Sequence, residues 1–196
     1  LAAPVSAVET LMAQYVDLGL SSARVHTGNP VHLVVGSYAD PGYSSKSGNL
    51  YVTWGQLQGL AAGEAGARGV IAHELAHWVQ DEEFVMASAA YSGLDYWWIE
   101  VSAENLAFLV EPGAIQDALF TYGRLQEEGD ARYALQLQPF TWSGSTNARY
   151  IQAIPVHVGL CDDPAICLLS QESLVRAINE GANPFTQGGM QATYYT

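Results

Sequence analysis

The pattern of apolar and polar residues changes from a helical to a strand period within the first third of the chain. Over residues 4–18 apolar residues recur every three or four positions, which predicts an amphipathic helix with Val5, Val8, Leu11, Met12, Tyr15 and Val16 on one side. Two β-rich runs follow, "VHLVVGSY" and "NLYVTW", separated by the turn-forming stretch "ADPGYSSKSG". We therefore expect a hairpin or two strands of one sheet in this part of the chain.

From residue 84 onward the pattern is mainly helical. The apolar spacing predicts helices over residues 95–110, 113–128, 146–160 and 170–181, separated by breaks that contain Pro, Gly or Ser. With 196 residues, 49% of them hydrophobic, the chain is long enough for one domain with its own core. The expected fold class is α+β, with a small N-terminal α/β lobe (1–83), a mainly helical C-terminal lobe (84–196) and a cleft between them.

The charge of the chain limits its partners. Twenty acidic residues against seven basic ones give a formal net charge of −13, which repels nucleic acids and anionic membrane surfaces. No apolar run approaches the roughly 18 to 20 residues that a membrane-spanning helix needs. We therefore expect neither a nucleic-acid partner nor a membrane.

Two cysteines bear on the compartment. Cys161 and Cys167, in "CDDPAIC", flank five residues that include a turn-forming Asp-Asp-Pro, a spacing that could close a small disulfide loop. The alternative is a pair of unlinked thiols in a cytosolic protein. Because the sequence also begins without Met and has a single Lys, we expect the bridge, and with it a secreted chain from which a signal has been removed.

The stretch "GVIAHELAHWVQ", residues 69–80, carries the strongest chemical signal. A four-residue step along a helix places His73 and His77 on one face, close enough for both imidazoles to bind one metal ion. Glu74 is offset by one position, where it can reach a metal-bound water and take its proton. The alternative is a buried pair of histidines with a structural role. The pattern favours zinc, one ion per chain.

The third ligand can come from two places. A turn of the form His-x-x-Gly-x-x-His/Asp would return the chain to the metal, but its Gly position is Gln80 and its last position is Glu83. The segment "DYWWIEVSAENLAFLV" instead offers Glu100 and Glu104, four residues apart and therefore on one helical face. One could bind zinc while the other hydrogen-bonds a ligand histidine.

These residues resemble the gluzincins, the thermolysin-like and aminopeptidase-like metallopeptidases in which His-Glu-x-x-His is completed by a Glu from a following helix. The resemblance implies a zincin-like fold, with Glu100 as the ligand and Glu104 as the carboxylate behind it. The segment "ARYIQAIPVHVGL" is similar to the one in which a Tyr stabilises the tetrahedral intermediate, which implies that role for Tyr150. The Gly-Ala-Met-Glu-Asn strand by which aminopeptidases hold a free N-terminus is absent from the sequence, which favours an endopeptidase.

The expected function is hydrolysis of peptide bonds in a peptide or protein substrate, by a zinc-bound water with Glu74 as general base. His157, two helical turns after Tyr150, and Tyr91 are further candidates for contacts to the substrate or transition state. The strand "NLYVTW" is expected to be a sheet edge that pairs with an extended peptide. Two other functions stay open: an inactive zincin-fold binding protein, and a zinc hydrolase of a non-peptide substrate.

Overall fold

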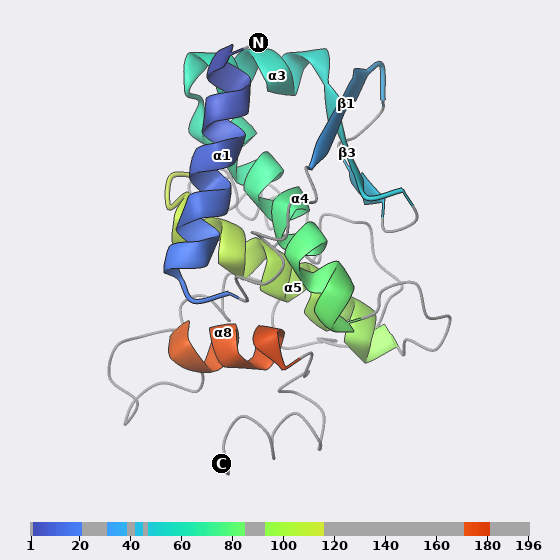
Figure 1. Ribbon diagram of the computed structural model, residues 1–196, viewed down its shortest axis with the longest axis vertical. Helices are drawn as coiled ribbons and strands as arrows, with labels where there is room; N and C mark the ends of the chain where they lie inside the picture. The colour runs from blue at the N-terminus through green and yellow to red at the C-terminus, as the bar shows by residue number, and fades with distance from the viewer. Residues whose placement is uncertain are drawn as a thin grey trace, which may run out of the picture. The chain divides into compact units, whose positions relative to one another are not determined.

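The computed structural model describes residues 2–20, 31–38, 42–44, 47–84, 93–115 and 171–180 (Figure 1). The chain divides into two compact units, one of Leu1–Ala87 with Leu106–Ala114 and one of Ser88–Asn105 with Ile115–Thr196. None of the described helices is long and apolar enough to cross a membrane. The zincin-like architecture, its cleft and its division into lobes of residues 1–83 and 84–196 stay predictions.

The first unit contains a mixed sheet of three strands, β1 (His32–Gly36), β2 (Gly42–Ser44) and β3 (Asn49–Thr53), in the order β1-β3-β2. β1 pairs with β3 in parallel, from His32 opposite Asn49 to Gly36 opposite Thr53. β2 pairs with β3 antiparallel, from Gly42 opposite Tyr51 to Ser44 opposite Asn49. The two β-rich runs thus form two strands of one sheet, and the hairpin alternative is wrong because they are parallel.

The position of β3 corrects a second expectation. The run "NLYVTW" was expected to form a free edge, but β3 lies between β1 and β2, so strands already pair with both of its sides. Its apolar alternation fits that central place, since Leu50 and Val52 are both fully buried. Among the described strands, β3 is therefore not an edge with which an extended peptide could pair.

Three helices complete the main part of the first unit: α1 (Ala2–Asp17), α3 (Trp54–Ala62) and α4 (Ala65–Phe84). α1 packs against α3 and α4, and buries Val8, Leu11 and Tyr15 as its periodicity predicts (Figure 1). Val5, expected on the same side, is 46% exposed. The predicted helix is confirmed, and its apolar face is narrower than expected at the first turn.

The connection from β3 to α4 consists of helix α3 and a short turn, and local interactions define both ends of α3. Thr53 caps α3, and its side chain accepts from the backbone N–H of Gln56, whose own side chain accepts from the backbone of Thr53. Gly63 ends α3 with φ at 76°, a left-handed conformation that favours glycine. Because the next helix begins at Ala65, this short turn sets the direction in which α4 starts.

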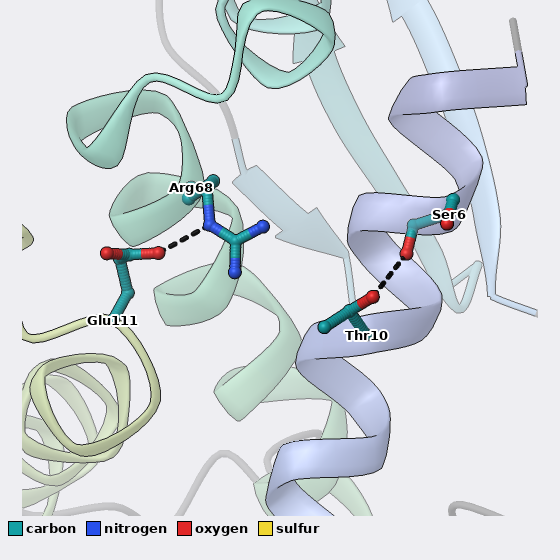
Figure 2. Close-up of polar contacts among 4 residues, drawn as sticks. All are labelled: Ser6, Thr10, Arg68 and Glu111. Carbon is teal, nitrogen blue, oxygen red and sulfur yellow. Dashed lines mark hydrogen bonds and ion pairs between the residues drawn. The ribbon is translucent and has the colours of Figure 1, made fainter.

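α4 is anchored near its N-terminal end by the segment Glu111–Ala114 of the same unit, which follows α5 (Gly93–Val110). Arg68 forms an ion pair with Glu111, as Figure 2 shows. A Cβ at Gly69 would lie 2.4 Å from the Cβ of Ala114, so only glycine permits this close approach.

Figure 2 also shows Thr10 of α1 donating to the carbonyl of Ser6, a bond within α1 itself.

In the second unit the structure describes the first part of α5 and the helix α8 (Gln171–Asn179). Both lie where helices were predicted, over residues 95–110 and 170–181, and both predictions are confirmed. α8 buries Leu174, Val175, Ala177 and Ile178, the spacing of an amphipathic helix. The predicted helix over 146–160 lies outside the described residues, as does most of the one over 113–128.

Candidate metal centre

The middle of α4 is buried on every side, since no residue from Ile71 to Gln80 is exposed. This agrees with its apolar residues, among them Ile71, Leu75 and Val79. Four polar side chains share the same burial: His73, Glu74, His77 and Gln80. Burying polar groups costs free energy unless they have partners, so their gathering on one buried stretch marks a site rather than ordinary core.

The two histidines face each other. The Nε2 atoms of His73 and His77 are 3.0 Å apart, and the two ring planes are nearly perpendicular at 89°. The expectation that a four-residue step brings both imidazoles together is therefore confirmed. Both rings are buried, with exposed fractions of 4% and 6%, so little water competes for their nitrogens.

Gln80 holds one of these rings from behind. The Nδ1 atom of His77 donates to the side-chain oxygen of Gln80 at 2.9 Å. In a neutral imidazole one nitrogen donates and the other accepts, so a proton on Nδ1 leaves Nε2 with its lone pair. That lone pair points toward Nε2 of His73.

The pair fits a zinc ion by its geometry. Two ligand nitrogens at 2.0–2.1 Å from a tetrahedral zinc stand about 3.3 Å apart. The observed separation of 3.0 Å is close to this value, so a small outward turn of the rings would admit the ion. Imidazole nitrogens are ordinary zinc ligands, and the hydrogen bond on Nδ1 of His77 is of the kind that orients them.

Glu100 is the third candidate ligand. One ligand atom from each of His73, His77 and Glu100 lies within 4.8 Å of the other two, and all three are at least partly buried. Glu100 is counted with the second unit and the histidines with the first, although α5 is one continuous helix that reaches both units. The geometric evidence for a metal site therefore comes from His73 and His77, and Glu100 as third ligand stays a prediction.

Glu74 is 7% exposed and follows His73 directly in α4. Glu104, expected behind the ligands, is half-buried on α5. The remaining predicted site residues, Tyr91, Tyr150 and His157, lie outside the described residues, as do Cys161 and Cys167. Their roles and the disulfide stay predictions.

Gln80 is the residue of this centre that the sequence interpretation missed. In the sequence pattern, position 80 has a role only as the place of the Gly in the His-x-x-Gly-x-x-His/Asp turn. Its spacing carries a usable signal, because a residue three positions after His77 lies on the same helical face and can reach its ring. A polar amide directly after Trp78 and Val79, in a helix that must be buried, strengthens that signal.

No family model, curated protein or solved structure matches the chain. The residues of α4 must therefore carry any functional conclusion.

Proposed function

We propose that this chain is a zinc-dependent peptidase, with His73 and His77 as ligands, Glu100 as the third ligand and Glu74 as general base. The observation that supports it most is the 3.0 Å approach of the two Nε2 atoms within the buried stretch Ile71–Gln80 of α4. A histidine pair with a purely structural role needs only the hydrogen bond between its rings. The buried Glu74 beside His73 is not needed for that role, so it favours a catalytic site.

Each residue would have a distinct task. His73 and His77 would hold the ion through their Nε2 atoms, and Glu100 would add a carboxylate oxygen. When bound, zinc would act as a Lewis acid that polarises the substrate carbonyl and lowers the pKa of water. Glu74 would take the proton of the attacking water and deliver it to the leaving amine.

The sequence resemblance to gluzincins supports a peptide substrate. The His-Glu-x-x-His residues on α4, two candidate ligands and a candidate base, are of the kind that such hydrolysis needs. A protein that only binds its partner has no use for a general base beside two metal ligands, so the intact Glu74 favours an enzyme. The sequence lacks the Gly-Ala-Met-Glu-Asn motif by which aminopeptidases hold the free N-terminus of a substrate. This favours cleavage within the peptide.

The first test is metal content combined with cleavage. We expect about one zinc per chain by elemental analysis after dialysis against buffer with trace zinc, and cleavage of a mixed peptide library detected by mass spectrometry. Protein without stoichiometric metal would overturn the proposal. Protein that holds zinc but cleaves no peptide would leave only the metal site.

Glu74→Gln is the matched variant for catalysis. The amide keeps the size of the side chain but cannot act as a base, so we expect unchanged zinc content and a loss of cleavage of about 10²- to 10⁴-fold. Glu64→Gln, an exposed residue just before α4, serves as the control and should cleave like the wild type. Full activity of the Glu74 variant would show that another group is the base.

A further inference from the structure

We infer that Gln80 is a positioning residue of the metal centre: it holds His77 in the tautomer whose Nε2 can bind a metal ion. The inference rests on the proposed zinc site. It concerns a residue that does not touch the ion, and acts only through the histidine ring.

The chain of hydrogen bonds has one consistent direction. The side-chain oxygen of Gln80 can only accept, so Nδ1 of His77 must donate to it across their 2.9 Å contact. The single proton of the neutral His77 ring is then on Nδ1, and its Nε2 must accept. In the zinc-free pair Nε2 of His73 is therefore the donor in the 3.0 Å contact between the rings, and it must give up this proton when a metal ion binds.

Burial makes this contact decisive. The side chain of Gln80 is 0% exposed and His77 is 6% exposed, so water cannot easily replace the amide as the partner of Nδ1. An apolar residue at position 80 would leave the Nδ1–H of His77 without this acceptor in the core. The ring would then favour a proton on Nε2, the nitrogen that must be free of a proton to bind zinc.

The helix provides the spacing for this arrangement. Gln80 follows His77 by three positions on α4, so both side chains lie on one face, with His73 one turn before them. The three residues therefore form a row along the helix, with the acceptor at one end and the two ligand nitrogens facing each other. Loss of such an oriented contact lowers metal affinity by about 10- to 100-fold.

The test compares zinc affinities, measured by competition with a chelating dye, in the full chain. Gln80→Leu removes the acceptor and should weaken zinc binding by about 10- to 100-fold, whereas Gln80→Glu retains an acceptor and should bind at least as tightly as the wild type. Gln56→Leu is the matched control, because it removes a glutamine hydrogen bond of the same unit at the start of α3. Its affinity should equal that of the wild type.

The tautomer itself gives a readout that needs no metal. In zinc-free protein, the ¹⁵N shifts of the imidazole nitrogens should place the proton of His77 on Nδ1 in the wild type and move it toward Nε2 in Gln80→Leu. If the Leu variant does not fold by circular dichroism, Gln80→Met takes its place, since Met is flexible and of similar length but lacks the amide acceptor.

The outcomes separate the inference from the function on which it rests. Wild-type affinity in Gln80→Leu, or a proton on Nε2 of His77 in the wild type, would overturn the role of Gln80 and leave the zinc site standing. If Gln80→Glu binds as weakly as Gln80→Leu, the amide acts by packing and the inference is also wrong. A wild type that binds no zinc would instead overturn the proposed function, and the shifts would still decide whether Gln80 sets the tautomer.

Discussion

At the scale of single residues, the centre depends on polar groups that occupy places where apolar ones would be more stable. Gln80 is fully buried on α4, directly after the buried apolar side chains of Trp78 and Val79. Its amide would cost free energy there without a partner, and His77 provides one at 2.9 Å. A polar residue that is buried at such a position is consistent with a function for the group that it contacts.

The third ligand is also decided at this scale. We expect Glu100→Ala to lose stoichiometric zinc, because the ion would keep only two protein ligands, and Glu104→Ala to weaken affinity by about 10- to 100-fold without abolishing binding. Zinc titration into both variants measures the difference.

Glu83→Ala and Asp95→Ala are the controls for this comparison, since they remove two other carboxylates near the motif in the sequence. Both should bind zinc like the wild type. Unchanged affinity in Glu100→Ala would exclude it as the ligand, and loss of zinc in the Glu83 variant would move the third ligand to the residues after α4.

At the scale of helices and strands, α4 is positioned by several separate contacts of the first unit. α1 and α3 pack against it, and Arg68 joins its beginning to Glu111. The hydroxyl of Tyr15, fully buried on α1, donates to the carbonyl of Ala72 at 2.6 Å. Ala72 directly precedes His73, so the N-terminal helix holds α4 at the level of its first ligand.

We expect Tyr15→Phe to lower the free energy of unfolding by about 0.5–1.5 kcal/mol, the usual net contribution of a buried hydrogen bond. Urea denaturation followed by circular dichroism measures this. Tyr38→Phe, at a position that is 38% exposed, is the control and should change stability by less than about 0.5 kcal/mol. Equal effects of the two changes would mean that the bond to Ala72 does not stabilise the packing of α1.

At the scale of the whole molecule, a bound ion would link folding to metal concentration. A ligand that binds only the folded chain stabilises it by about 2.7 kcal/mol when its free concentration is one hundred times its Kd. We therefore expect zinc to raise the melting temperature and a chelator to reverse the rise. The double variant His73→Ala, His77→Ala should show no such dependence, whereas a melting temperature of the wild type that ignores both zinc and chelator would argue against the site.

Local patterns were sufficient to predict most of the helices and strands in the part of the chain that the structure describes. The helical period over residues 4–18 and 95–110 and the two β-rich runs each predicted an element that the structure contains, because periodicity reports which face of a segment is buried. The four-residue step from His73 to His77 determined the facing of the two rings in the same way. These features need only the geometry of one helix or strand.

Only the tertiary structure decided the features that depend on partners distant in sequence. β3 is a central strand because β2, formed within an apparent loop, pairs with one of its sides and β1 with the other. Val5 is exposed because its neighbours in space, not its period, determine its burial. Gln80 acts on His77 because packing excludes water from both, a condition that spacing along the chain cannot express. The sequence by itself determined which side chains share one face of a helix or strand. The tertiary structure decided which residues pack against that face and whether water reaches it.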